Sequence, residues 1–139
     1  MARNTNLHAA KTAKNDEFYT QYSDIEKEVS NYKEHFKGKW VLCPCDARWS
    51  NFYKFFQDHF MEYGLARLTA TNYDNGDGAW RVDYFGGGAE NVQRLKGNGD
   101  FRSKEVTDIM KQADIVVTNP PFSLFRDFVA WLNGKEFSL

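Results

Sequence analysis

The stretch at residues 113–125, ADIVVTNPPFSLF, decides the fold. Its run Ile115–Val117 is apolar and β-branched, which is typical of a strand buried on both faces of a parallel sheet. Two prolines follow, and because proline cannot continue a strand ladder, the chain must turn there. The turn presents Asn119 at the carboxyl end of the strand, where α/β sheets hold their ligands.

A helix is expected directly after this turn. Ser123 can cap its first turn, and apolar residues then recur at helical spacing along one face. These residues are Leu124, Phe125, Phe128, Val129 and Leu132. The order of strand, rigid polar turn and helix favours a binding function at the turn, although Asn-Pro also begins many ordinary turns.

The turn Asn119-Pro120-Pro121-Phe122 suits the methylation of an aromatic amine. Such an amine is a poor nucleophile because its lone pair is delocalised into the ring. The Asn119 amide oxygen and the Pro120 carbonyl can accept its two N–H bonds, which raises electron density on nitrogen and aligns the lone pair with an incoming methyl group. Phe122 offers a face on which a base turned out of a duplex can stack.

Composition predicts one folded domain with little general affinity for nucleic acid. The chain has 139 residues, 12 of them Phe, and a formal net charge of −1. Free-standing DNA-binding domains are usually strongly basic, so any DNA affinity is expected to be local, weak or supplied by another part. We recognise no signal peptide or long apolar span, and Cys43 and Cys45 suit neither an easy disulfide nor a zinc site. We therefore expect a reduced, cytoplasmic protein.

Two helices and a strand are expected in the first half of the chain. Residues 23–26 form a capping box for a helix that buries Ile25, Val29, Tyr32 and Phe36 and ends at Gly38. Residues 40–42 form the first core strand. A helix at residues 51–63 then ends at Gly64, with an aromatic buried side. That side consists of Phe52, Phe55, Phe56, Phe60 and Tyr63.

The loop Cys43-Pro44-Cys45-Asp46 joins this strand to the following helix, which is the order of the first nucleotide-binding turn in a doubly wound sheet. It lacks the glycines usual at such a turn. The cysteines also suit small core positions, whereas the Asp46 carboxylate beside a helix start can hold a ligand's ammonium group. The loop is therefore a candidate ligand site.

A second strand is expected at residues 65–71, followed by Asn72-Tyr73-Asp74. In doubly wound sheets an acidic residue here binds ribose hydroxyls, so Asp74 is a candidate, with Tyr73 against an adenine ring. An Asx turn leading into residues 75–78 is an equally good interpretation. A β-hairpin turned by three glycines is inserted next, between the second and third core strands. A short helix with Val106, Ile109 and Met110 returns the chain to Ile115–Val117.

These features resemble the adenine-N6 DNA methyltransferases of the EcoRI type over nearly all of the chain from about Lys14. Asn119-Pro120-Pro121-Phe122 is similar to motif IV of amino-group DNA methyltransferases, whose pattern is (D/N/S)PP(Y/F). Cys43 to Asp46 with Ser50-Asn51-Phe52 resembles motif I of the EcoRI type, in which C-x-C-D replaces the glycines. Residues 15–21 resemble motif X and residues 97–101 resemble motif III. The order X, I, II, III, IV is that of the γ arrangement.

The resemblance implies an α/β fold, a partial Rossmann-like methyltransferase sheet with helices on both faces. It implies transfer of a methyl group from S-adenosyl-L-methionine to adenine N6 in double-stranded DNA, with the adenine flipped out. The implied catalytic residues are Asn119, Pro120, Pro121 and Phe122. The implied cofactor-binding residues are Tyr19, Thr20, Cys43, Cys45, Asp46, Tyr73, Asp74, Asp100 and Phe101. No metal is implied.

Residues 1–14 are expected to be a disordered tail, with a DNA-contacting arm as the alternative. Residues 15–139 are expected to be a truncated methyltransferase domain. Residues 135–139 open a fifth strand, and the family's remaining sheet and target-recognition region would lie beyond it. A sheet cut there leaves Ile115–Val117 as an apolar edge for the missing carboxyl-terminal half, a homodimer mate or another protein to cover.

Two other functions remain open. One is an inactive relative that binds cofactor, DNA or protein, which the near-neutral charge favours. The other is a methyltransferase that acts on RNA or on a protein amide and shares the Asn-Pro-Pro-aromatic turn. The similarity to motifs I and X favours DNA.

Overall fold

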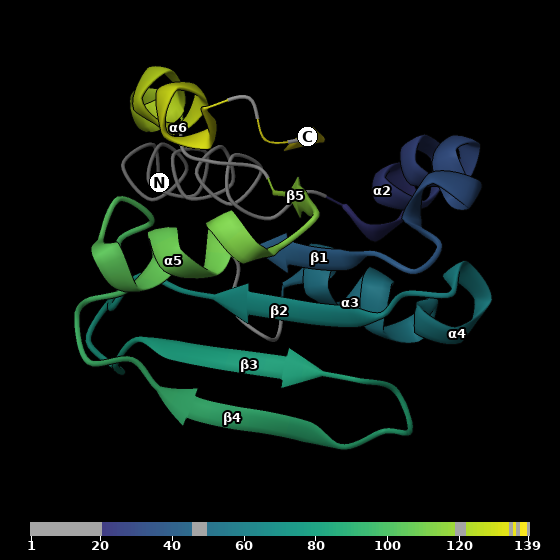
Figure 1. Cartoon of the computed structure of the whole chain (residues 1–139), viewed down its shortest axis with the longest axis horizontal. Helices are drawn as coiled ribbons and strands as arrows, with labels where there is room; N and C mark the ends of the chain where they lie inside the picture. The colour runs from purple at the N-terminus through teal and green to yellow at the C-terminus, as the bar shows by residue number, and fades with distance from the viewer. Residues whose placement is uncertain (1–20, 46–49, 119–121, 134, 136, 139) are drawn as a thin grey trace, which may run out of the picture.

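The computed structural model describes residues 21–45, 50–118, 122–133, 135, 137 and 138. These residues form a six-stranded mixed sheet in the order β4-β3-β2-β1-β5-β6 (Figure 1). The strands are β1 Trp40–Cys43, β2 Arg67–Thr71, β3 Trp80–Tyr84, β4 Glu90–Arg94, β5 Ile115–Val117 and β6 Phe137–Ser138.

Helices cover both faces of the sheet (Figure 1). One face packs against α2 Tyr22–Val29, the 3-10 segment η1 Ser30–Phe36, α3 Asn51–Asp58 and α4 Phe60–Tyr63. The other face packs against α5 Lys104–Gln112 and α6 Phe125–Leu132, the latter preceded by the 3-10 turn η2 Phe122–Leu124. The expected α/β class is therefore confirmed. In the described residues, no helix is both long and apolar enough to cross a membrane.

The strand β1 lies at the centre of the sheet and pairs in parallel with β2 on one side and β5 on the other. Leu42 is opposite Thr69 in β2 and Val116 in β5. The expected burial of Ile115–Val117 on both faces is confirmed, because Ile115 and Val117 pack on the α3 side while Val116 packs on the α5 side. All three have exposed fractions of 1% or less.

The aromatic helix after β1 is confirmed in its core residues but is not continuous. All five predicted residues are buried. The Ser50 hydroxyl accepts a hydrogen bond from the Tyr53 amide at 3.2 Å and so caps α3. At His59 the backbone leaves helical geometry, with φ −105° and ψ 14°, and this residue separates α3 from α4.

Tyr53 is a buried residue that the sequence pattern did not indicate. Its side chain is fully buried, and its hydroxyl donates a hydrogen bond to Glu90 Oε2 in β4 at 2.7 Å. Burial, followed by the bond to Glu90, raises the pKa of the Tyr53 hydroxyl. The bond thus attaches α3 to the far edge of the sheet.

The expected helix at residues 25–36 differs in its start and its middle. The helix α2 begins at Tyr22, and the preceding Gln21 makes no side-chain capping bond, so the expected capping box at residues 23–26 is wrong. Tyr32 has non-helical backbone angles, φ −120° and ψ 21°, and its side chain is 55% exposed instead of lying in the core. This kink is the reason that the regular helical spacing fails there.

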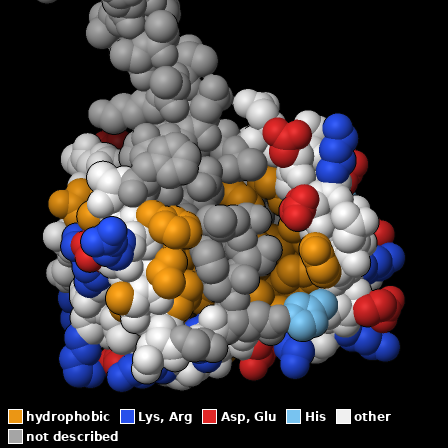
Figure 2. All heavy atoms as spheres, turned by 90° about the horizontal axis from the view of Figure 1, so that it is seen from above, with side chains coloured by type: hydrophobic (Ala, Val, Ile, Leu, Met, Phe, Trp, Pro, Cys, Tyr) orange, Lys and Arg blue, Asp and Glu red, His pale blue; other side chains and the backbone are white. Residues whose placement is uncertain are grey.

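The start of the helix that follows the two prolines also differs from the expectation. Ser123 lies in η2, and α6 begins at Phe125 after Leu124, without a side-chain capping bond. The expected Ser123 cap is therefore wrong, because an additional 3-10 turn makes the entry. Phe128 and Leu132 are buried as expected, whereas Phe125 and Val129 are 40% and 47% exposed. Figure 2 shows hydrophobic side chains on the surface seen from above, the side on which α6 lies in Figure 1.

The two ends of the sheet bear on two expectations. The predicted hairpin between the second and third core strands is confirmed as β3 and β4. It extends the sheet from β2 by antiparallel pairing, and β5 is the next parallel strand among the described residues. The predicted fifth strand forms as β6 and pairs with β5, with Phe137 opposite Val116. The expectation that β5 is an exposed edge is therefore wrong, since β6 covers it.

The loop before α5 crosses closely over the loop after β2. The Asp74 amide donates a hydrogen bond to the Asn98 carbonyl at 2.8 Å. Gly99 has a φ of +80°, and a Cβ atom there would lie 1.9 Å from the Asn72 carbonyl oxygen and 2.9 Å from the Ala79 Cβ. Both the backbone conformation and the available space therefore require glycine at this position.

We predict that Gly99→Ala lowers the free energy of unfolding by about 3 kcal/mol or more, because it combines backbone strain with a steric overlap. Urea unfolding measures this change. Gly87→Ala is the matched control, since Gly87 has a φ of +79° and nothing within 4 Å of its added Cβ. The control should lose only about 1–2 kcal/mol, the cost of a left-handed alanine. Equal losses in the two variants would contradict the close crossing.

Candidate functional site

Three parallel strands end at one edge of the sheet. The strands β1, β2 and β5 run in the same direction, so Cys43, Thr71 and Val117 end them at that edge. The Thr71 hydroxyl donates a hydrogen bond to the Pro44 carbonyl at 2.9 Å and joins the chain after β1 to the end of β2. Thr118, the residue before Asn119, is fully buried. The carboxyl edge of this α/β sheet is where a ligand site is expected.

Several predicted site residues lie outside the described residues. They are Tyr19, Thr20, Asp46, Asn119, Pro120 and Pro121, and the side chain of Phe122 belongs with them. The described chain reaches Cys45 on one side of the first gap and Thr118 on one side of the second. The predicted roles of these residues remain predictions.

The two cysteines lie in different surroundings. Cys43 is fully buried in the core on the α3 side of the sheet. Cys45 is half-buried and packs against the core on the α5 side. Neither cysteine forms a disulfide within the described residues. Cys43 therefore serves the core, and Cys45 is the one closer to the surface of the carboxyl edge.

Asp74 lies in a tight loop that its own carboxylate helps to close. Its Oδ1 atom accepts hydrogen bonds from the Gly76 and Gly78 amides at 2.8 and 3.0 Å, which is the Asx arrangement that the sequence allowed. These two donors hold the pKa of Asp74 below its usual value. Among the described residues, no donor bonds to the other oxygen, Oδ2. The neighbouring Tyr73 side chain is 52% exposed.

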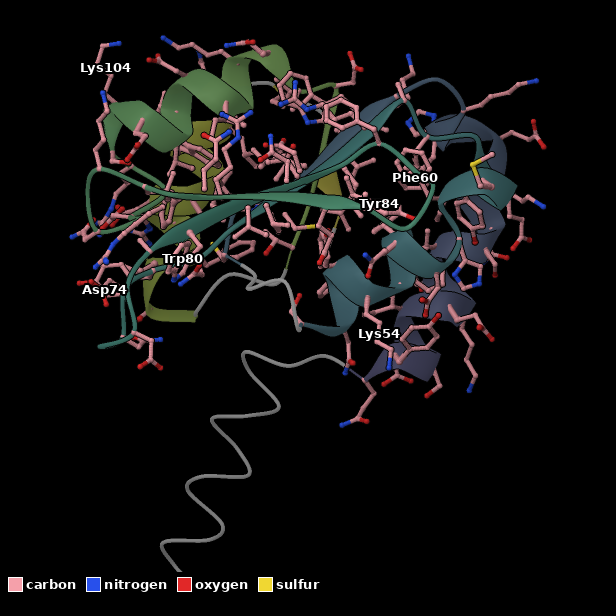
Figure 3. All side chains as sticks on the ribbon, turned by 90° about the horizontal axis from the view of Figure 1, so that it is seen from below. Lys54, Phe60, Asp74, Trp80, Tyr84 and Lys104 are labelled. Atoms are coloured by element: carbon pink, nitrogen blue, oxygen red, sulfur yellow. The ribbon has the colours of Figure 1, made fainter. Side chains whose placement is uncertain are left out.

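Asn72 fixes the base of the same loop. Its Oδ1 accepts a hydrogen bond from the Trp80 amide at 3.0 Å, and its Nδ2 donates to the Gly78 carbonyl at 3.1 Å. Figure 3 shows Asp74 and Trp80 at one end of the sheet, away from Phe60 and Tyr84. Asn72 belongs to none of the sequence motifs with an expected role. Its position directly before Tyr73 and Asp74 is the signal that the sequence offers.

Asp100 is held by the residue two positions after it. Its Oδ1 accepts from the Arg102 amide at 2.8 Å and from Arg102 Nε at 3.0 Å, and its Oδ2 accepts from Arg102 Nη2 at 2.8 Å. The Arg102 side chain holds the pKa of Asp100 below its usual value. The carboxylate is thus ionised and fixed in orientation.

Phe101 is buried, with only 4% of its surface exposed. Its ring makes edge contacts with Phe128 and Trp131 of α6 at centroid distances of 5.2 and 5.3 Å. Phe101 therefore attaches the loop before α5 to the helix that follows the proline turn. In this arrangement much of its ring surface is already covered by protein.

The structure brings two of the predicted acidic residues into neighbouring loops. The backbone bond from Asp74 to Asn98 joins their segments, and Gly99 allows the close approach. Ionised carboxylates only accept hydrogen bonds, and the hydroxyl and amino groups of an adenosine are donors. The acceptor chemistry of this pair therefore fits a ligand that offers hydroxyl and amino hydrogens, such as an adenosine. Groups of metal-binding side chains are absent from the described residues.

Comparison with known proteins finds relatives over nearly the whole chain. The family model described as adenine-specific methyltransferase EcoRI matches residues 6–138. The Type II methyltransferase M.EcoRI of Escherichia coli is 48% identical over 93% of this chain and 46% of its own length. The Type II methyltransferase M.MpnI of Mycoplasma pneumoniae is 48% identical over 94% of this chain and 42% of its own length. No solved structure matches.

The chain spans less than half the length of the curated relatives it matches. The resemblance inferred from the motifs is confirmed by a family model that covers residues 6–138. This chain belongs to the EcoRI family of adenine-specific methyltransferases.

Proposed function

We propose that this chain is the amino-terminal catalytic part of a DNA methyltransferase that transfers a methyl group from S-adenosyl-L-methionine to adenine N6 in double-stranded DNA. The observation that carries the proposal is the pair of ionised carboxylates, Asp74 and Asp100, in adjoining loops at the carboxyl edge of the sheet. The parallel strands β2, β1 and β5 lie at the centre of the sheet, with helices on both faces, and this arrangement supports a partial Rossmann-like sheet. The relatives are named Type II methyltransferases, which supports a role in restriction-modification.

The cofactor is proposed to lie across the carboxyl edge. Asp74 would accept from the ribose hydroxyls through Oδ2, and Asp100 would accept from the adenine amino group. The half-exposed Tyr73 would lie against the adenine, and the buried Phe101 would support the loop that carries Asp100. The methionine end is assigned to the residues implied by the family resemblance, namely Tyr19, Thr20, Cys43, Cys45 and Asp46. The bound cofactor supplies an activated methyl group on a sulfonium.

Catalysis is proposed to rest on orientation rather than on a general base. Asn119 and the Pro120 carbonyl accept the two N–H bonds of the target amine and direct its lone pair toward the methyl group. The rigid Pro120-Pro121 pair holds these acceptors in place, and Phe122 stacks on the flipped adenine. Support comes from β5, which ends one residue before the buried Thr118 and so leads the chain directly to Asn119.

The remaining length of the relatives is proposed to pack on α6 and β6. Phe125 and Val129 lie one helical turn apart on α6 and are both substantially exposed, while β6 is the last strand at that end of the sheet. The match to this chain covers less than half of each relative. The next segment of the relatives would follow the equivalent of β6. We therefore propose that the carboxyl-terminal part of an EcoRI-type methyltransferase binds this surface.

An inactive binding module is the alternative function. The observation in its favour is the formal net charge of −1, which is low for a protein that binds DNA. The intact Asn119-Pro120-Pro121-Phe122 turn and the methyltransferase names of the relatives favour the enzyme.

The cofactor proposal predicts that the chain binds S-adenosylmethionine and that Asp46→Ala weakens binding by about 10- to 100-fold, the effect of losing a charge-assisted hydrogen bond. Isothermal titration calorimetry measures both affinities. Glu62→Ala is the control, since Glu62 is an exposed carboxylate on α4, which leads into the amino end of β2. Unchanged affinity in Asp46→Ala would contradict the role of Asp46, and no binding by the unaltered chain would contradict a complete cofactor site.

The catalytic proposal predicts that Asn119→Ala reduces methyl transfer by about 100- to 1,000-fold, because one acceptor for the target amine is lost. The assay follows labelled methyl incorporation into unmethylated genomic DNA, with the carboxyl-terminal part of M.MpnI supplied. Ser123→Ala is the control, because Ser123 is exposed and does not cap α6. Full turnover by Asn119→Ala would refute the mechanism, and no transfer by the unaltered pair would refute the proposed activity.

The docking proposal predicts that the double substitution of Phe125 and Val129 by serine weakens association with the carboxyl-terminal part of M.MpnI by about 30-fold, since two partly buried apolar side chains are lost. Calorimetry gives the affinity. Met61→Ser on α4 is the control, because Met61 is 80% exposed and lies on another element. Equal weakening in the control, or self-association of the chain through the same residues, would overturn the assignment.

A further inference from the structure

We propose that Arg102 is a positioning residue, which orients the Asp100 carboxylate toward the cofactor's adenine and links that carboxylate to the start of α6. This inference rests on the proposed function, because it takes Asp100 as the acceptor of the adenine amino group. Arg102 directly follows the residues that resemble motif III and has no role in that motif.

The contacts of Arg102 fix both oxygens of Asp100. The guanidinium approaches in a forked geometry, with Nε on Oδ1 at 3.0 Å and Nη2 on Oδ2 at 2.8 Å. The Arg102 backbone amide adds a third donor on Oδ1 at 2.8 Å. A carboxylate held by a planar fork and by a backbone amide cannot rotate freely, because each donor defines a direction in the carboxylate plane.

The same contacts leave one place for a ligand. A carboxylate has about four lone-pair sites, and Arg102 occupies two on Oδ1 but only one on Oδ2. The remaining acceptor position is therefore on Oδ2. A single N–H donor, such as one hydrogen of an adenine amino group, matches that capacity. Arg102 thus decides which oxygen of Asp100 is available.

Arg102 also meets the helix that follows the proline turn. Its Nη1 lies 3.4 Å from Asp127 Oδ2 in the first turn of α6, and its guanidinium lies over the Phe101 ring at 5.3 Å. Phe101 in turn contacts Phe128 and Trp131. The loop that carries Asp100 is therefore attached to α6 in two ways. A polar contact joins them at the protein surface, and an aromatic cluster joins them in the core.

The charges around Arg102 agree with these contacts. The pKa of Arg102 is raised, first by its hydrogen bond to Asp100, and the charges of Asp100 and Asp127 act in the same direction. Asp100 belongs to the loop before α5 and Asp127 to α6. Arg102 is thus the cation that joins these two segments.

The ordinary surface ion pair is the competing explanation, and the same region contains one for comparison. Lys104 Nζ lies 2.8 Å from Asp108 Oδ2 within α5, with the lysine side chain 89% exposed. Such pairs contribute little. The Arg102 side chain is 46% exposed and contacts residues of its own loop and of α6, so it differs in both burial and connectivity.

The test measures ligand binding rather than turnover. The unaltered chain, Arg102→Ala, Arg102→Lys and the control Lys104→Ala are titrated with S-adenosylhomocysteine and with its analogue in which hydrogen replaces the purine 6-amino group. We expect Arg102→Ala to bind S-adenosylhomocysteine about tenfold more weakly and to bind the analogue with little change, so that the preference for the amino group is lost. Arg102→Lys should restore part of the preference, and Lys104→Ala should retain all of it.

A double-mutant cycle with Asp100→Asn tests whether Arg102 acts through Asp100. If it does, the double variant binds S-adenosylhomocysteine no more weakly than the weaker-binding single variant. If the two residues act independently, the fold-losses of affinity in the single variants multiply in the double variant. Equal weakening toward both compounds, multiplied effects, or an unchanged preference in Arg102→Ala would each overturn the inference. Circular dichroism and thermal midpoints confirm folding of each variant.

The outcomes also separate this inference from the function on which it rests. If the unaltered chain binds neither compound, both the cofactor proposal and the role of Arg102 fail. If the unaltered chain binds S-adenosylhomocysteine with a preference that Arg102→Ala retains, only the role of Arg102 fails.

Discussion

The parallel pairing of β1 with both β2 and β5 is the constraint on which the rest of the structure depends. All residues of the three strands except Trp40 and Arg67 are buried, and Leu42 is opposite residues of both neighbours, so their register is fixed by packing on both faces. Parallel strands end at a common edge. The chain must therefore leave β1, β2 and β5 at nearly the same place, and the Thr71 bond to the Pro44 carbonyl holds two of those exits together. Residues far apart in sequence gather at this edge because of the register.

The loops at this edge keep two carboxylates charged although they lie in adjoining segments. Asp74 is stabilised by the backbone amides of Gly76 and Gly78, whereas Asp100 is stabilised by Arg102. Each carboxylate thus has its own donors, and neither depends on a proton shared with the other. This arrangement maintains two acceptors for a ligand that offers hydroxyl and amino hydrogens. The close crossing at Gly99 keeps the two loops together without placing a side chain between them.

The sequence predicted the parts of the fold that depend on local patterns of buried residues. The β-branched run Ile115–Val117 and the aromatic face of residues 51–63 were correct because burial dominates their energetics. The expected caps at Ser23 and Ser123 were wrong, because α2 already begins at Tyr22 and an additional 3-10 turn precedes α6. A short hydrogen-bonding motif does not indicate either start. The kink at Tyr32 similarly removes a residue from the core that regular spacing had placed there.

The sequence nominates the candidate site residues but not the contacts that position them. Asp74 was nominated by its position after the second strand of a doubly wound sheet, and Asp100 by its resemblance to a family motif. Asn72 bonds to the Trp80 amide, and Arg102 contacts Asp127. Gly99 lies so close to the Asn72 carbonyl that no side chain fits there. Contacts of this kind are set by the crossing of loops. A single sequence contains no periodic signal for such a crossing.

Carboxylates pair with three of the five arginines in the described residues of this chain, whose formal net charge is −1. Arg67 and Arg81 both bond to the buried Asp83, and Arg102 is engaged by Asp100 and Asp127. These cations serve the interior of the protein and the proposed cofactor site, and their charge is neutralised by carboxylates. Phosphate contacts need cations that are available to DNA. Under the proposed function, these three arginines therefore hold the sheet and the proposed cofactor site, and the contacts with DNA phosphates fall to other cations of this chain or of the carboxyl-terminal part proposed to dock on it.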